Sequence, residues 1–338
     1  MKILVYGAGA IGGYLGAILT ATGEDVTLVA RGAQYDALSS RGIQLEGPRS
    51  GRPGPVRVRV CKPGEEKGPY DTIFVTLKSQ QIAGAAQHLR GLVAKDGVFV
   101  FPQNGIPWWY FQGIESKFKG VQLKTVDPDG MLSRTFEPRQ IIGGVALKPA
   151  DLVEPGRIRL VDSDTEALVM GEIDNSGTPR LEALGAMLTR AGWTGRVVND
   201  IRKAKWSKVL SNATWNPLGA ITQSTAKEVS SFAGTQPLAV AVMREVIAVA
   251  AAVGTPLEGD PETLVATAAK RASIPSSTLQ DVRAGRPLEM DAIVNAVLEL
   301  GALTGVATPS LAVVAACANL LNRRIIDDRV AIRPVKLN

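Results

Sequence analysis

A glycine-rich turn close to the start of the chain limits the fold more than any other feature. Residues 2–6 have the apolar pattern of a buried strand, and residues 11–22 have that of a helix. Residues 25–30 supply a second strand, so the three segments form a βαβ unit. The turn between the first strand and the helix has the pattern G-x-G-x-x-G and consists of Gly7, Ala8, Gly9, Ala10, Ile11 and Gly12. In this setting the pattern predicts a Rossmann fold that binds the pyrophosphate of a dinucleotide at the helix amino terminus.

The residue at the end of the second strand indicates whether NAD or NADP is bound. Enzymes that use NAD usually have an acidic residue there, which binds the ribose 2′-hydroxyl group. This chain has Ala30 and Arg31 instead, and a guanidinium group can form a forked pair with a 2′-phosphate. The sequence therefore predicts NADP (NADPH) rather than NAD. Lys78 follows a strand at 72–76 and is expected to reach the same crevice, with a plain surface lysine as the alternative.

The pattern of elements changes along the chain. Further strands are predicted at 72–76, 98–101, 141–147, 157–161, 167–170 and 195–198, with a helix at 179–191. From Asp200 onward the chain is predicted to be helical, at 201–222, 225–232, 237–253, 259–271, 288–304 and 309–322. The predicted fold class is α/β, an N-terminal Rossmann domain with a doubly wound parallel sheet followed by an all-helical C-terminal domain. The expected boundaries are 1–199 for the NADP-binding domain, 200–325 for the substrate and catalytic domain, and 326–338 for a loosely held tail.

Composition excludes several classes of function. The net charge of +6 suits an anionic ligand, but the basic residues are scattered, so nucleic-acid binding is not expected. Cys61 and Cys317 have neither disulfide nor metal-ligand spacing, which favours a cytoplasmic protein. The chain enters a strand pattern at once, so no signal peptide is expected. The most apolar helix, at 237–253, is interrupted by Arg244 and Glu245 and is too short for a membrane span.

The chain has one histidine, His88, and this count narrows the possible chemistry. His88 lies in a predicted helix beside Gln87 and Arg90, where a solvated surface position is expected. A Ser-His-Asp triad and a zinc site with several histidines are therefore not expected, and no metal is predicted. Acid–base catalysis must use another type of residue.

A polar stripe in the predicted helix 201–222 offers such a residue. Lys208, Asn212 and Asn216 are spaced four apart, so they lie on one face of the helix. An ammonium group partly buried beside the adjoining apolar face would have a lowered proton affinity, which suits a general acid near neutral pH. The two amides could hold a carboxylate or hydroxyl group of a substrate. On spacing alone, a solvated polar stripe is an equal alternative.

Five specific motifs occur in order along the chain. One of them, W-x-K-x-x-x-N-x-x-x-N-P-L, runs from Trp206 to Leu218. The other four are the opening K-I-L-V-Y-G-A-G-A-I-G-G with Arg31, T-L-K-x-x-Q at 76–81, Q-N-G at 103–105, and S-S-x-x-Q-D…E-x-D at 276–291. Together they resemble the motifs of the ketopantoate reductases (2-dehydropantoate 2-reductases), and the likeness runs from residue 1 to about residue 320.

The resemblance implies a role for each matching residue. Lys208 would be the proton donor, and Glu289 would help to orient it and contact the cofactor. The substrate would be held by Asn104, Lys208, Asn212, Asn216 and Ser277. The cofactor would be held by the turn at residues 7–12, Arg31, Lys78, Gln81, Asn104, a backbone group near Ala150, and Glu289. NADPH would deliver hydride to a branched 2-oxo acid in a cleft between the domains while Lys208 protonates the oxygen.

Two features depart from the family pattern. The aromatic run at 108–111, Trp-Trp-Tyr-Phe, is followed by a mostly polar segment at 112–140. These rings could reshape the substrate pocket, but packing in a core or a subunit interface is favoured. Some family members have a further substrate-binding asparagine where this chain has Thr225 and Ala226.

The predicted function is reduction of ketopantoate to pantoate by NADPH, in pantothenate (coenzyme A) biosynthesis. One alternative is an NADP-dependent reductase of a different 2-oxo or 3-oxo acid. Another is a non-catalytic NADP-sensing protein, although such a protein would need neither Lys208 nor Glu289. The predicted partner is a small-molecule 2-oxo acid. The alanine-rich helices would suit a homodimer interface or a bundle core equally well.

Overall fold

The structure is a computed structural model that describes residues 1–47, 54–161 and 166–335. Contacts within the chain divide it into two compact units. The Rossmann unit comprises Met1–Gln103, Trp108–Gln122 and Asp129–Ile201. The helical unit comprises Asn104–Pro107, Leu123–Pro128 and Arg202–Asn338. Two short segments that follow β6 in the sequence therefore belong to the helical unit.

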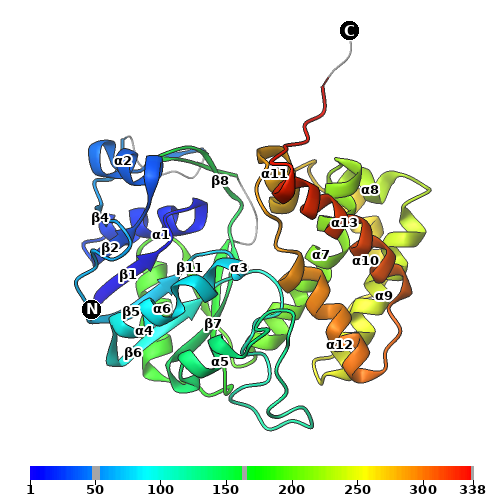
Figure 1. Cartoon of the computed structure of the whole chain (residues 1–338), viewed down its shortest axis with the longest axis horizontal. Coiled ribbons are helices and arrows are strands. Elements are labelled where there is room, and N and C mark those ends of the chain that lie inside the picture. Colours follow the sequence, from blue (N-terminus) through cyan, green and yellow to red (C-terminus); the bar gives the residue numbers. More distant parts are fainter. Residues whose placement is uncertain (48–53, 162–165, 336–338) are drawn as a thin grey trace. The chain divides into compact units, whose positions relative to one another are not determined.

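An eight-stranded sheet forms the centre of the Rossmann unit, with the strand order β11-β10-β7-β6-β5-β1-β2-β4 (Figure 1). Its strands are β1 (Lys2–Tyr6), β2 (Asp25–Val29), β4 (Arg59–Cys61), β5 (Tyr70–Val75), β6 (Val93–Phe101), β7 (Ile141–Leu147), β10 (Ala167–Glu172) and β11 (Thr194–Val197). β1 is an interior strand that pairs in parallel with β2 on one side and β5 on the other. This arrangement confirms the predicted doubly wound fold, except that β7 and β10 pair antiparallel.

One face of the sheet is covered by α1 (Ala10–Ala21), α6 (Pro179–Arg190) and a small second sheet. The second sheet has the order β3-β9-β8 and consists of β3 (Gln44–Glu46), β8 (Ala150–Glu154) and β9 (Arg157–Leu160). Leu15 of α1, Leu184 of α6 and Ile158 of β9 belong to the same apolar cluster as Val5 and Leu28 of the large sheet. This shared core holds α1 against β1 and β2, next to the glycine turn.

The aromatic run packs on the opposite face of the same sheet. Trp108 makes an edge contact with Phe101, and both rings contact Phe136. The four rings at 108–111 are each at most 7% exposed. The core interpretation of this run is therefore confirmed, within the Rossmann unit itself. The segment that follows contains α5 (Met131–Thr135) and η2 (Pro138–Gln140), and the unit is completed by α2 (Gly32–Arg41), α3 (Ser79–Ile82), η1 (Ala83–Ala85) and α4 (Ala86–Leu92).

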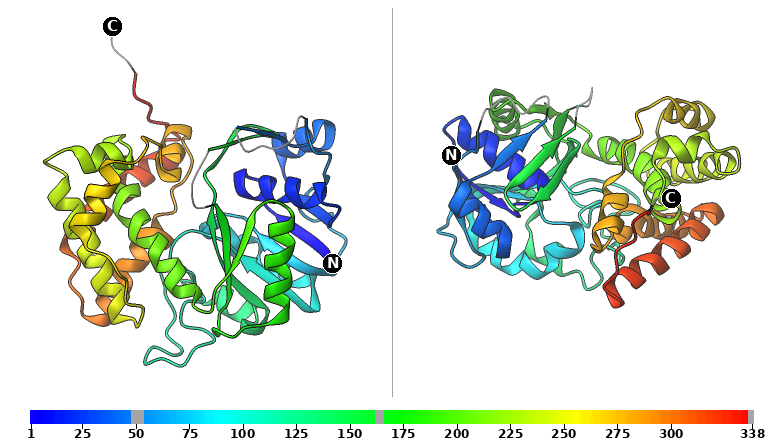
Figure 2. Two further views of the ribbon diagram at one scale, coloured as in Figure 1. Left: turned by 180° about the vertical axis from the view of Figure 1, so that it is seen from behind. Right: turned by 90° about the horizontal axis from the view of Figure 1, so that it is seen from above.

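The helical unit consists of helices and turns in the part of it that the structure describes (Figure 2). They are α7 (Ile201–Thr222), α8 (Ala226–Ser231), α9 (Gln236–Ala252), α10 (Pro261–Ala269), α11 (Ser277–Ala284), η3 (Asp291–Asn295), α12 (Ala296–Thr304) and α13 (Pro309–Asp327). All except α11 lie within or next to predicted helices. Asp260 caps α10 by accepting a hydrogen bond from the Thr263 N–H at 2.8 Å, as its place before Pro261 predicts.

The end of the chain differs in two respects from the expected loose tail. α13 continues to Asp327, beyond the predicted end at residue 322. The following segment is exposed, but the Ile332 N–H donates to the Val282 carbonyl at 3.2 Å, which attaches it to α11.

None of the helices in the described parts of the chain is long and apolar enough to cross a membrane.

Candidate active site

The glycine turn is held in shape by two hydrogen bonds to neighbouring strands. Gly7 has a φ of +114°, which favours glycine over residues with a side chain. The Ala8 N–H donates to the Val29 carbonyl of β2 at 3.1 Å. The Thr76 hydroxyl, just after β5, donates to the Gly7 carbonyl at 2.7 Å. The turn is thus fixed from both strands that flank β1.

The other two glycines of the motif have different surroundings. A Cβ atom at Gly12 would overlap the Gly7 carbonyl oxygen and the Thr76 hydroxyl, so α1 can approach the turn this closely only with glycine there. A Cβ atom at Gly9 would meet nothing within 4 Å. The turn is therefore closed by α1 at Gly12 and open at Gly9, as a backbone must be to approach a phosphate group.

Gln34 of α2 also holds this turn, and the sequence analysis does not identify it. Its side-chain amide donates to the Ala8 carbonyl at 2.7 Å, and its side-chain oxygen accepts from the Gly156 N–H at 2.9 Å. Gly156 lies between β8 and β9, so Gln34 connects the turn to the second sheet. A glutamine two residues into a helix has no local signal for such a contact, since the partners are 26 and 122 residues away.

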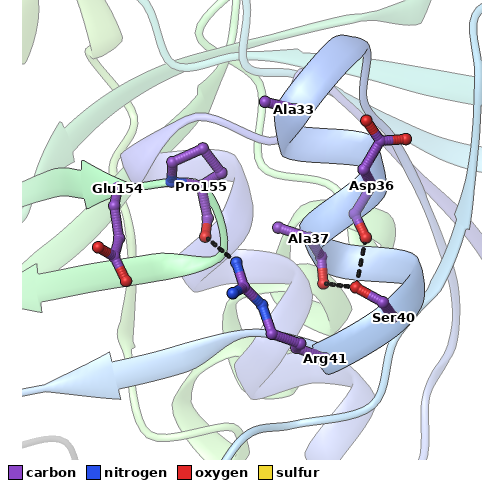
Figure 3. A pocket seen from close by; sticks show the side chains of 7 residues that line it. All are labelled: Ala33, Asp36, Ala37, Ser40, Arg41, Glu154 and Pro155. Carbon is purple, nitrogen blue, oxygen red and sulfur yellow. Dashed lines mark hydrogen bonds between the residues drawn. The ribbon is translucent and has the colours of Figure 1, made fainter.

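A shallow pocket lies between α2 and the end of β8 (Figure 3). It is lined by Ala33, Asp36, Ala37, Ser40, Arg41, Glu154 and Pro155. Arg41 donates to the Pro155 carbonyl at 3.2 Å across this pocket. The lining includes none of the residues predicted to form the site, and two carboxylates against one guanidinium do not suit an anion.

Outside the turn, the predicted cofactor residues of the Rossmann unit occupy three separate places. Arg31 is exposed at the residue before α2. Lys78 precedes α3, and its backbone N–H donates to the side-chain oxygen of Gln81 at 3.1 Å, so part of Gln81 serves to cap that helix. Ala150 begins β8 and pairs with Leu160 of β9.

In the helical unit, Lys208 lies on α7 between fully buried apolar residues. Trp206 and Val209 are each 0% exposed, and Lys208 is partly buried. Burial lowers the pKa of Lys208 to about 8, while the nearby Glu289 carboxylate acts to raise it. An ammonium group with this pKa is charged at neutral pH and yet gives up a proton readily.

Glu289 and Asn104 come together from distant parts of the sequence. The Asn104 side-chain amide donates to a Glu289 carboxylate oxygen at 3.4 Å. The Ile106 N–H donates to the Ala292 carbonyl at 2.7 Å, and Gly105, with a φ of +80°, leaves no room for a Cβ atom beside Ala292. Ala292 belongs to η3, a π-helix with hydrogen bonds between residues five apart, which begins two residues after Glu289.

The two asparagines of the predicted stripe follow Lys208 along α7. Asn212 is half-buried, one turn after Lys208. Asn216, one turn further, is 4% exposed, and its side-chain amide nitrogen has no hydrogen-bond partner among the described residues. A buried donor without a partner costs free energy, so this amide is suited to a ligand oxygen.

Two other predicted positions lie at the starts of α11 and α8. Ser277 is exposed in the first turn of α11, whose cap is Ser276. Thr225 is 7% exposed, and its backbone N–H donates to a Glu228 carboxylate oxygen at 2.6 Å. The Thr225 hydroxyl accepts from the Glu228 N–H, which makes a capping box for α8. The backbone N–H and the hydroxyl of Thr225 are therefore both engaged with Glu228.

A second buried lysine, Lys205, is missing from the sequence prediction. It is 2% exposed, and burial lowers its pKa to about 7, with the charge of Lys208 acting in the same direction and Glu289 opposing. Its place three residues before Lys208 puts both amines on one face of α7. That spacing is the signal that could have identified it.

His88 was predicted to lie on the surface, and no metal site was predicted. His88 is 41% exposed and lies 2.9 Å from a Glu66 carboxylate oxygen, which agrees with its predicted surface position. In the described residues there is no cluster of histidine, cysteine, aspartate and glutamate that could hold a metal ion.

Comparison with known proteins identifies the family. Residues 3–175 match the family described as Ketopantoate reductase PanE/ApbA, and residues 200–322 match Ketopantoate reductase PanE/ApbA C terminal. A 2-dehydropantoate 2-reductase from Mesorhizobium japonicum is 35% identical over 324 residues, which cover 95% of this chain and 98% of that protein. The chain belongs to the ketopantoate reductase family. Membership confirms the resemblance found in the motifs and the predicted enzyme class, an oxidoreductase acting on a CH–OH/C=O pair.

Solved structures agree with this assignment. A 2-dehydropantoate 2-reductase from Geobacter metallireducens superimposes with a TM-score of 0.82 at 28% identity, covering 95% of this chain and 99% of that one. A D-mandelate dehydrogenase superimposes with a TM-score of 0.81 at 20% identity, covering 96% and 100%. The second likeness concerns the fold alone.

Proposed function

We propose that this family member reduces 2-dehydropantoate (ketopantoate) to pantoate with NADPH, as a step of pantothenate and coenzyme A biosynthesis. The observation that carries the proposal is the lowered pKa of Lys208, about 8, in a group with Glu289 and Asn104. Relatives named 2-dehydropantoate 2-reductase along almost the whole chain support the choice of substrate.

The glycine turn fits a dinucleotide, because it is open at Gly9 and Gly9 is also the N-cap of α1, where backbone N–H groups are available to an anion. When bound, the nicotinamide cofactor supplies the hydride. The residues that would hold it are those of the turn at 7–12, Arg31, Lys78, Gln81, Asn104, a backbone group near Ala150, and Glu289. Arg31 at the end of β2, where no carboxylate is present, favours NADPH over NADH.

The side chains of the helical unit would bind the 2-oxo acid and protonate it. The free amide of Asn216, with Asn212, Asn104 and Ser277, would hold the carboxylate and hydroxyl oxygens of the substrate. The Lys208 ammonium would donate a hydrogen bond to the ketone oxygen and stabilise negative charge there. As the C=O double bond becomes a single bond, a proton passes from Lys208 Nζ to that oxygen. Lys208 is left as a neutral amine and regains a proton from solvent.

The direct test is the rate of NADPH oxidation with ketopantoate, repeated with NADH. We expect turnover that requires ketopantoate and a higher kcat/KM with NADPH than with NADH. No turnover with either cofactor would contradict the proposal.

Thr225 favours a second candidate, a reductase of a different 2-oxo acid. Its hydroxyl and backbone N–H are committed to Glu228, so this position offers no amide to a substrate. A panel of 2-oxo acids in the same assay separates the two candidates. A kcat/KM for ketopantoate no higher than for simple 2-oxo acids would favour the second.

The pH dependence of the reduction should follow the protonation of Lys208. Because only the ammonium form can donate a proton, kcat should be constant below pH 8 and fall by about tenfold per pH unit above it. The oxidation of the 2-hydroxy acid needs the neutral amine and should rise over the same range. Glu289→Gln removes the charge that raises the pKa of Lys208, so the fall in the reduction rate should begin at lower pH.

Glu258→Gln serves as the control for this pH experiment, since Glu258 is 92% exposed and pairs with Lys203 on the surface. It should leave the pH profile unchanged. An alkaline limb that stays in place in Glu289→Gln would show that Glu289 does not act on the proton donor.

A further inference from the structure

Two chain segments leave the same edge of the large sheet side by side. β4 pairs in parallel with β2, with Cys61 opposite Val29. The Ala30 N–H then donates to the Cys61 carbonyl at 3.1 Å. This register places Lys62 opposite Ala30, the residue before Arg31, at the carboxyl edge of the sheet.

The side chain of Lys62 is directed toward the start of α2. Its ammonium lies 5.0 Å from the centroid of the Tyr35 ring, and Tyr35 donates its N–H to the Arg31 carbonyl at 3.4 Å. The Lys62 N–H donates to a Glu65 carboxylate oxygen at 2.9 Å, which fixes the turn after β4. Lys62 thus lies over Tyr35, which is one helical turn after Arg31.

The electrostatics of Tyr6 support this arrangement. Tyr6 ends β1, immediately before the glycine turn. Burial raises the pKa of the Tyr6 phenol, Glu66 and Cys61 raise it further, and the charge of Arg31 lowers it. The guanidinium of Arg31 and the end of β4 therefore both lie close to the end of β1, where the turn begins.

More positive than negative charge is exposed to solvent around Arg31 and Lys62. Arg31 and Lys62 are exposed, and neither forms an ion pair with another described residue. The Glu66 side chain is 0% exposed, and its carboxylate accepts from the Gly64 N–H at 2.8 Å and faces His88. Glu65 is the carboxylate that stays exposed here, and one of its oxygens is occupied by the Lys62 N–H. The solvent-exposed charges are therefore the cations of Arg31 and Lys62 and the carboxylate of Glu65, which already accepts one hydrogen bond.

We propose that Lys62 acts with Arg31 as a second cationic group for the 2′-phosphate of the cofactor, which makes the end of β4 a determinant of cofactor specificity. This inference rests on the proposed use of NADPH. A phosphate monoester carries close to two negative charges at neutral pH, more than one guanidinium neutralises. Arg31 supplies a planar fork and Lys62 a movable point charge, a combination suited to a phosphate on an exposed ribose.

The test is calorimetric titration of the full chain with NADPH, NADH, adenosine 2′-monophosphate and adenosine 5′-monophosphate. Lys62→Gln should weaken NADPH and the 2′-monophosphate by about tenfold, the size expected for one exposed contact to a charged group. It should leave NADH and the 5′-monophosphate unchanged. Lys62→Arg keeps the charge and should keep the affinity. Lys67→Gln removes an exposed lysine from the same loop and should have no effect.

Equal weakening of NADPH and NADH by Lys62→Gln, or no weakening of either, would overturn the inference. If the parent protein still prefers NADPH in those titrations, the proposed function stands and Arg31 acts without Lys62. If the parent protein binds NADPH and NADH equally well, the NADPH part of the proposed function fails, and the role of Lys62 fails with it.

Discussion

Lys208→Ala is expected to lower kcat for ketopantoate reduction by on the order of 10²- to 10⁴-fold, the usual contribution of a positioned general acid. The alkoxide that forms on hydride transfer would have to take its proton from water. The affinity for NADPH should stay within about twofold of the parent value, because the predicted dinucleotide contacts lie mainly in the turn at 7–12 and at Arg31. Single-turnover kinetics and a calorimetric titration measure the two quantities separately.

Lys203→Ala is the matched control for this variant. Lys203 lies on the same helix, is 52% exposed and pairs with Glu258, so its loss should leave kcat unchanged. A Lys208→Ala protein with full activity would place the proton donor elsewhere, and Lys205 is then the next amine to replace. If the parent protein and the variant were equally inactive on every 2-oxo acid, the NADP-sensing alternative would be favoured.

Gly12→Ala is expected to weaken cofactor binding by roughly 5- to 150-fold, which corresponds to about 1–3 kcal/mol of overpacking. The added methyl group would overlap both the Gly7 carbonyl and the Thr76 hydroxyl that holds it. Neither can move without moving the turn, because Gly7 is backbone and Thr76 directly follows β5. Titration with NADPH measures the loss, and thermal unfolding reports any loss of overall stability.

Gly91→Ala provides a control within the same unit. Gly91 lies in α4, and a Cβ atom there meets nothing within 4 Å, so alanine should be neutral or slightly stabilising. An unchanged NADPH affinity in Gly12→Ala would show that the turn adapts and that its close approach to α1 is not needed for binding.

The long elements could be predicted because their apolar residues repeat with a clear period. α7 begins and ends at the predicted residues, 201 and 222, and β1 and β7 agree equally well. β3 and β4 have three residues each, too few to show an alternating pattern. α2 buries only Ala37 and Leu38, so its helical period is hardly visible in the sequence.

The candidate site could be predicted only in part, for a related reason. Helical spacing alone aligned Lys208 with Asn212 and Asn216 on one helix. The contact between Asn104 and Glu289 joins residues 185 apart in the sequence, so it depends on the packing of the whole unit. Glu289 and Ser277 were reachable only through the resemblance to a known family.

Other contributions to the site depend on burial, which has no local signature. The lowered pKa of Lys205 comes mainly from burial, which a pattern of polar neighbours in the sequence does not indicate. Gln34 contacts Ala8 and Gly156, and Lys62 contacts Tyr35, and all of these partners are distant in the sequence. Conversely, packing in a core or a subunit interface was favoured for the aromatic run at 108–111, and its four rings are buried within the Rossmann unit.

Because of the π-helix η3, the number of residues between Glu289 and α12 cannot change without moving Glu289. The Ala296 N–H bonds to the Asp291 carbonyl five residues earlier, while the Ala292 carbonyl accepts from Ile106. Deleting one residue here would restore ordinary α-helical geometry and rotate everything before it by about 100° around the helix axis. Glu289 would then be turned away from Lys208 although no side chain of the site had been replaced. Among homologous chains, gains and losses of single residues should therefore be rarer in this stretch than substitutions.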